Sequence, residues 1–108
     1  MFRRLFETLR CLVAPFDVEA FAVGLFIDSG LPRHEAKIEG KIVAYIFRFV
    51  SPDMKQTFGP KIITAALVYD RAKNNSRWNV KVEKIAAAAG VRAEILHDVI
   101  NRGQKLTI

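Results

Sequence analysis

Apolar residues recur at helical spacing along almost the whole chain. Between residues 17 and 50 apolar residues recur in the i, i+3, i+4, i+7 pattern of amphipathic α-helices. Gly30 and Pro32 divide this region into a helix over about 17–30 and a helix over about 32–50. The first apolar face consists of Val18, Phe21, Ala22, Leu25 and Phe26, and the second of Ile38, Ile42, Tyr45, Ile46 and Phe49. We expect both faces to point into the core, with Lys37, Lys41 and Arg48 in solvent.

The first fourteen residues show a further amphipathic pattern, which Pro15 ends. An apolar face opposite several arginines suits packing on the protein's own core, a membrane surface, a homodimer seam or a groove for a partner. Packing on the core is favoured, because most amphipathic helices cover their own domain. If this face is exposed, it is the candidate partner-binding surface. Its residues are then Phe2, Leu5, Phe6 and Leu9.

The middle of the chain predicts one buried helix. Ser51-Pro52-Asp53 ends the preceding helix or opens a short turn, and Pro60 suits a first helical position. The stretch from Pro60 to about Lys73 contains "IITAALV", which is apolar or small on every side. Such a helix is expected at the centre of the domain, where Ala65 and Ala66 allow neighbouring helices to approach closely.

Two short helices follow, over about 80–89 and 92–102, with Gly90 as a left-handed turn and Gly103 as the end. The pattern satisfies the requirements of a helix-turn-helix, although many αα-hairpins satisfy them too. The residues expected to hold the hairpin together are Ile85, Ala86, Ala89, Val91, Leu96 and Val99.

The polar residues of this hairpin are the candidate nucleic-acid contacts. They are Arg77, Lys81, Lys84, Arg92, His97, Asn101 and Arg102. Glu94 and Asp98 weaken the interpretation, since carboxylates are repelled by phosphates. Trp78 is interpreted as a core anchor rather than a base-stacking platform. Reading of DNA and simple packing over the core both remain open.

With 108 residues and no linker, residues 1–108 are expected to form one all-α domain, an orthogonal bundle of five to six helices. "GPKIITAALVYDRAK" followed by "WNVKVEKIAAAAGVRAEILHDVINRG" resembles the cyclin-box repeat of transcription initiation factor IIB. Motif-like matches lie within 60–100. The resemblance implies a cyclin-like core over 17–103 that binds promoter DNA or proteins of the transcription machinery. The chain departs from that family in having room for one repeat, one cysteine and Arg71 after the central tyrosine.

Charge and composition limit the possible functions. Residues 53–108 carry 10 Lys and Arg against 5 Asp and Glu, so this half holds +5 of the +6 net charge and favours a polyanionic partner. Cys11 is the only cysteine, which excludes an internal disulfide and a multi-cysteine zinc site and favours a reducing, intracellular location. No motif predicts an enzyme, a metal, a cofactor or a membrane span.

The sequence therefore predicts a small basic nucleic-acid-binding protein, a regulator of transcription, that uses a helix-turn-helix-like hairpin. The alternative is a protein-interaction or oligomeric structural module that uses the N-terminal amphipathic helix, with a homodimer among its possible forms.

Overall fold

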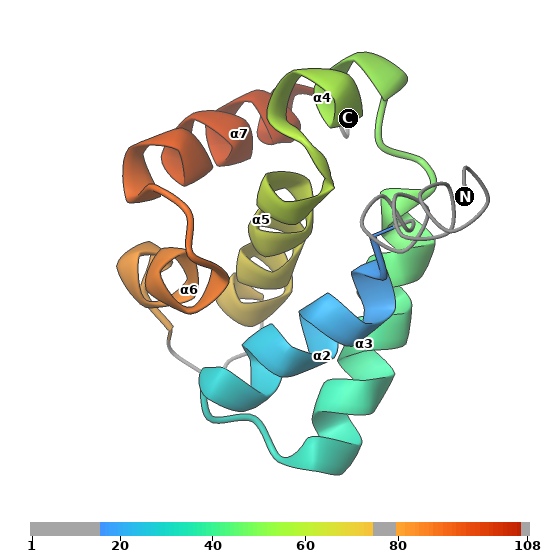
Figure 1. Ribbon diagram of the computed structural model, residues 1–108, viewed down its shortest axis with the longest axis vertical. Helices are drawn as coiled ribbons and strands as arrows, with labels where there is room; N and C mark the ends of the chain where they lie inside the picture. The colour runs from blue at the N-terminus through green and yellow to red at the C-terminus, as the bar shows by residue number, and fades with distance from the viewer. Residues whose placement is uncertain (1–15, 75–79, 107–108) are drawn as a thin grey trace, which may run out of the picture.

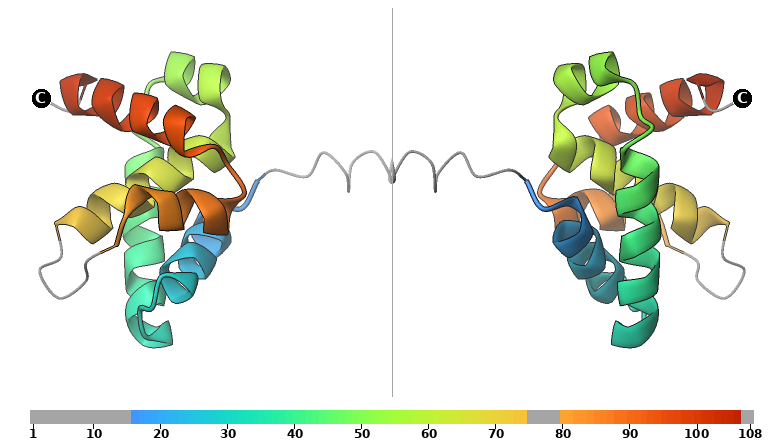
Figure 2. Two further views of the ribbon diagram at one scale, coloured as in Figure 1. Left: turned by 90° about the vertical axis from the view of Figure 1, so that its left-hand side faces the viewer. Right: turned by 90° about the vertical axis from the view of Figure 1, so that its right-hand side faces the viewer.

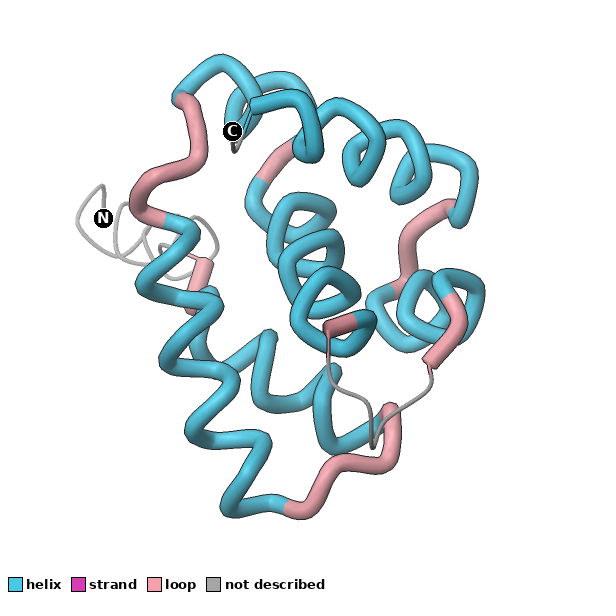
Figure 3. The backbone as a smooth tube through the Cα atoms, turned by 180° about the vertical axis from the view of Figure 1, so that it is seen from behind, coloured by secondary structure: helices cyan, strands magenta, loops and turns pink. Residues whose placement is uncertain are grey.

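The computed structural model describes residues 16–74 and 80–106, and every regular element within them is an α-helix (Figures 1 and 3). The prediction of an all-α fold is confirmed. In chain order the helices are α2 (Val18–Asp28), α3 (Arg33–Phe47), α4 (Pro52–Phe58), α5 (Pro60–Lys73), α6 (Val82–Ala89) and α7 (Ala93–Leu106).

Helix α2 begins and ends where the sequence places its signals. The carboxylate of Asp17 accepts a hydrogen bond from the backbone N–H of Ala20 at 3.0 Å, which caps the first turn. At the other end Gly30 takes a φ of 104°, and the N–H of Leu31 donates to the carbonyl of Phe26. Of the five residues predicted to face the core, Ala22, Leu25 and Phe26 are buried, and Val18 and Phe21 are partly buried.

Helix α4 was not predicted. Ser51 caps it by accepting from the N–H of Met54 at 3.2 Å, Pro52 occupies the first turn, and Asp53 places a carboxylate at the positive end of the helix dipole. The preceding helix therefore ends at Phe47 rather than near residue 50. At the C-terminus Gly103 does not end α7, which continues to Leu106.

Helix α5 is the central element, as predicted. It packs against α2 and α3 on one side and against α6 and α7 on the other, with α4 at its N-terminal end (Figure 1). Thr64 is fully buried, and its hydroxyl donates to the carbonyl of Pro60 at 2.6 Å, which avoids an unsatisfied polar group. The buried residues of α5 are Ile63, Thr64, Ala65, Ala66, Val68 and Ala72.

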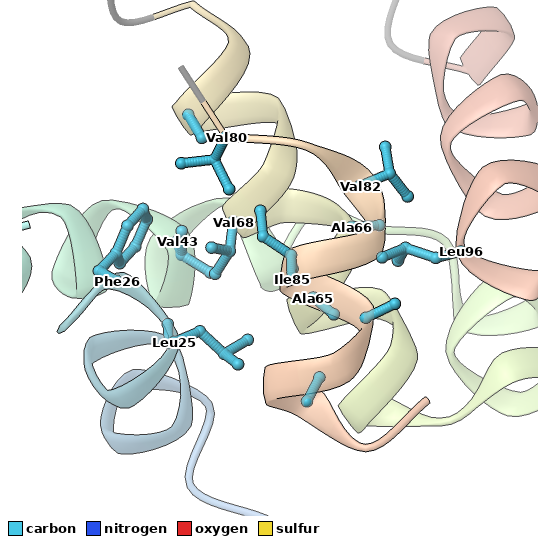
Figure 4. Packing of buried hydrophobic residues seen from close by; sticks show 14 of the residues in the cluster. Leu25, Phe26, Val43, Ala65, Ala66, Val68, Val80, Val82, Ile85 and Leu96 are labelled. Atoms are coloured by element: carbon cyan, nitrogen blue, oxygen red, sulfur yellow. The ribbon is translucent and has the colours of Figure 1, made fainter. Parts of the chain in front are cut away.

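The core is continuous across α5. Phe26 and Val43 lie on one side of Val68, and Ile85 and Leu96 approach from the hairpin on the other side (Figure 4). Each of these five side chains is fully buried. One core therefore connects the α2–α3 pair with the C-terminal hairpin.

The predicted orientation of α3 is wrong. The structure buries Ala36, Gly40 and Val43, whereas Ile38 and Tyr45 are exposed. Small residues face the core because α2 crosses α3 closely at Gly40, where an added Cβ would lie 3.3 Å from the carbonyl oxygen of Glu19. The larger apolar side chains are thereby turned outward. Ile42 and Ile46 are partly buried, and Phe49, beyond the end of the helix, is exposed.

An ion pair joins α3 and α5. The guanidinium of Arg71 donates from Nε to Oε2 of Glu39 at 2.7 Å and from Nη2 to Oε1 at 3.1 Å. This hydrogen-bonded carboxylate raises the pKa of Arg71 above its usual value, although desolvation opposes the shift. Arg71 therefore links the two helices.

We expect Arg71→Ala to lower the free energy of unfolding by about 1–2 kcal/mol, because the half-buried Glu39 loses two charged hydrogen bonds. Arg71→Lys should recover less than half of that loss, since lysine cannot form the bidentate pair. Urea unfolding followed by circular dichroism measures both effects. Lys73→Ala, on the exposed last turn of α5, is the control and should stay within about 0.5 kcal/mol of the parent protein.

Candidate nucleic-acid interface

The α6–α7 hairpin has the predicted turn. Gly90 adopts left-handed backbone angles, with φ 70° and ψ 34°. Its N–H donates to the carbonyl of Ala87 at 3.2 Å, and the N–H of Val91 donates to the carbonyl of Ala86 at 2.9 Å. These two bonds satisfy carbonyls at the end of α6 and turn the chain sharply into α7. A residue with a Cβ at position 90 would be strained.

The inner face of the hairpin is also as predicted. Ile85, Ala86 and Ala89 are buried on α6, Leu96 and Val99 are buried on α7, and Val91 is half-buried in the corner. Packing against α5 thus fixes which faces of α6 and α7 point outward (Figure 2, left). The outward residues are the ones available to a partner.

The predicted contact residues lie on two helices and the turn between them. Lys81 immediately precedes α6, Lys84 lies on its outer face, Arg92 lies in the turn, and His97, Asn101 and Arg102 lie on α7; all six are exposed. Arg77 lies outside the described residues.

Carboxylates of α7 pair with Arg92 in the turn and with Arg102 on α7. Arg92 donates to Glu94 at 2.8 Å, and Arg102 donates to Asp98 at 3.3 Å while its guanidinium carbon lies 5.5 Å from the ring centroid of Phe58. The imidazole of His97 lies 3.7 Å from Glu83 of α6. Exposed ion pairs of this kind contribute at most about 1 kcal/mol, so a phosphate can replace the carboxylate as the partner. The carboxylates nevertheless reduce the local positive potential.

The α6 side of the hairpin has a cation that sequence reasoning missed. A Cβ placed on Gly90 would lie 3.4 Å from Nζ of Lys61, so this lysine of α5 reaches the hairpin turn. Lys61 is 29 positions before Gly90. Only the packing of α6 on α5 brings the two together, and no local pattern in the sequence indicates it. Lys61, Lys81 and Lys84 are three exposed lysines on or beside α6.

The predicted partner-binding surface lies outside the described residues. Its members are Phe2, Leu5, Phe6 and Leu9. Within residues 16–74 and 80–106, no group of three or more histidine, cysteine, aspartate or glutamate residues is placed to hold a metal ion. In the same ranges no helix has the length and apolar character that crossing a bilayer requires.

Comparison with known proteins gives no relative. No protein-family model, no curated protein and no solved structure matches the chain.

Proposed function

We propose that the protein binds the phosphate backbone of nucleic acid through the α6–α7 hairpin and acts as a regulator of transcription. The observation that carries the proposal is the hairpin itself. A left-handed glycine turn and a buried inner face hold α6 and α7 together, with Lys81 exposed just before α6 and Lys84 exposed on it. A rigid helical pair with exposed cations suits backbone contacts on duplex DNA.

The resemblance to the cyclin-box repeat supports the same proposal. In that family, a hairpin of this kind follows a buried central helix containing consecutive alanines. Here the central helix α5 buries Ala65 and Ala66, and it is followed by α6 and α7. We therefore propose a cyclin-like arrangement of the core. By the same resemblance, we propose proteins of the transcription machinery as further partners.

Charge assigns different roles to the two helices of the hairpin. Lysines on and beside α6 provide the sequence-independent attraction to phosphates, and Arg92 and Arg102 contribute after exchanging their carboxylate partners for phosphates. His97 and Asn101, on the outer face of α7, are the residues proposed to lie near base edges.

The test is the double variant Lys81→Ala with Lys84→Ala, titrated with a labelled duplex at two salt concentrations. Losing two phosphate contacts should weaken binding about tenfold or more at low salt and should reduce the slope of log affinity against log salt by about 2. Fluorescence anisotropy measures both quantities. The effect should be similar for unrelated duplex sequences, because phosphate contacts carry no sequence information.

Lys37→Ala with Lys41→Ala is the matched control, since it removes the same charge from exposed positions of α3, on the other side of α5 (Figure 1). This control should retain most of the affinity. Equal affinities and equal salt slopes for the two double variants would contradict the proposal, because they would show a response to net charge alone.

A further inference from the structure

The outward side of α3 exposes large apolar side chains. The exposed fractions are 59% for Ile38, 61% for Tyr45 and 72% for Phe49, and only one other large hydrophobic residue among the described residues, Ile27, counts as exposed. Single exposed apolar residues are common on protein surfaces, whereas several along one helix mark an association surface. We refer to Ile38, Ile42, Tyr45 and Phe49 as the outer α3 stripe.

The spacing of the stripe is that of a helix–helix seam. Successive members are separated by four, three and four residues, the alternation found at the a and d positions of coiled coils. Although α3 ends at Phe47, the N–H of Phe49 donates to the carbonyl of Ile46 at 2.9 Å and continues the helical turn. The rings of Tyr45 and Phe49 are 5.2 Å apart, edge to face. At about 1.5 Å per residue, the stripe is about 16 Å long, or three helical turns.

The border of the stripe is cationic. Lys41 and Arg48 each directly precede a member of the stripe, which corresponds to the g position beside a coiled-coil seam, and both are exposed. Glu35 and Glu39, the two carboxylates of α3, are only partly exposed, and Glu39 is bonded to Arg71. A partner on this surface therefore faces apolar side chains with positive charge beside them.

The positive charges beside the outer α3 stripe distinguish between the molecules that could bind it. An antiparallel second copy would bring Lys41 and Arg48 against the same cations of its partner, which is repulsive. Residues 1–14 carry Arg3, Arg4 and Arg10 against the single acid Glu7, so they provide little complementary charge. Nucleic acid would match the cations but not the isoleucines of the stripe.

We propose that the outer α3 stripe docks an amphipathic α-helix of a partner protein whose apolar seam is flanked by glutamate or aspartate. Apolar packing along three turns provides the affinity, and the acidic flanks paired with Lys41 and Arg48 provide the choice of partner and orientation. This surface lies on α3 and the hairpin lies on α6 and α7, so that α5 separates the two (Figure 2, right and left). The proposal does not depend on nucleic-acid binding.

The test uses two synthetic helical peptides with the same leucine seam, one flanked by glutamates and the other by lysines. Each labelled peptide is titrated with the full-length protein and followed by fluorescence anisotropy. We expect the acidic peptide to bind at least tenfold more tightly than the basic one. Ile38→Ser with Phe49→Ser should reduce that binding at least tenfold, and Lys41→Glu with Arg48→Glu should reverse the preference. Both pairs change exposed side chains, so the helical circular dichroism should not change.

Lys81→Glu with Lys84→Glu is the matched control. It makes the same change in charge on the hairpin and should leave acidic-peptide binding within about twofold of the parent while reducing DNA binding. Equal binding of the two peptides, or binding unaffected by the serine substitutions, would overturn the proposal. It would also be overturned if the serine substitutions dissolved a dimer seen by light scattering. Peptide binding that appeared only after removal of residues 2–14 would also overturn the proposal, because those residues would then occupy the outer α3 stripe.

Discussion

Ile85→Ala is expected to lower the free energy of unfolding by about 3–4 kcal/mol, within the range measured for removing a large buried aliphatic side chain. Ile85 is fully buried and lies where α6 meets the rest of the core (Figure 4). Truncation removes apolar contact and leaves a cavity that close packing on every side prevents from collapsing. Urea unfolding followed by far-ultraviolet circular dichroism gives the change in stability.

A graded series makes this prediction specific to packing. Ile85→Val removes one methylene and should cost about 1 kcal/mol, and the double variant Lys81→Ala with Lys84→Ala should leave the unfolding midpoint almost unchanged. The hairpin would not be part of the common core if Ile85→Ala cost no more than Ile85→Val. The same series separates a loss of DNA binding caused by unfolding from one caused by missing charge.

The hairpin could be predicted almost residue by residue because its determinants are local. Gly90 is the residue type that takes a left-handed turn at no steric cost, and the apolar residues before and after it recur at helical spacing, which indicates their shared buried side. The structure places Ile85, Ala89 and Leu96 on the buried side, as the sequence predicts. The acids Glu94 and Asp98 are exposed.

Helix α4 was missed although its signals are local. Ser51, Pro52 and Asp53 form a good helix start, with a capping hydroxyl, a residue pre-set for helical φ and an acid in the first turn. The same three residue types also favour turns, and a helix of seven residues has too few positions to show a clear apolar period.

Part of the charge pattern of the candidate interface could not be predicted from the sequence, because it depends on contacts between helices. The proximity of His97 to Glu83, the position of Arg102 over Phe58 and the approach of Lys61 to Gly90 all join residues of different elements. Long charged side chains have many rotamers, and their partners are set by the packing of the helices that carry them. The pairs of Arg92 with Glu94 and of Arg102 with Asp98 are local in the sequence, whereas the contacts between helices have no local signal.

The orientation of α3 is the most informative error. Apolar residues lie on both sides of this helix, and periodicity favours the side with the larger ones, Ile38 and Tyr45. The structure instead buries the side with Ala36 and Gly40, because a close crossing with α2 gains contact along both backbones. Apolar periodicity thus cannot separate a core face from an exposed apolar face when a helix has both. The size of the residues at the helix crossing decides between them.

Gly40→Ala tests that explanation, and we expect it to destabilise the protein by about 1–3 kcal/mol although alanine favours helices more than glycine. The new Cβ would overlap Cγ2 of Val23 and would lie 3.3 Å from the carbonyl oxygen of Glu19. Valine has few rotamers in a helix, so relief requires α2 and α3 to move apart. Urea unfolding measures the loss, and an unchanged circular dichroism spectrum shows that the helices persist.

Two variants separate overlap at the crossing from a general effect of replacing glycine. Gly24→Ala lies within α2, where an added Cβ has no atom within 4 Å, and it should stabilise the protein by about 0.4–1 kcal/mol. Val23→Ala combined with Gly40→Ala removes the overlapping Cγ2 methyl group and should be more stable than the sum of the two single effects predicts. Additive effects, or a stabilising Gly40→Ala, would mean that the close approach at Gly40 does not determine the orientation of α3. The exposure of the outer α3 stripe would then need another cause.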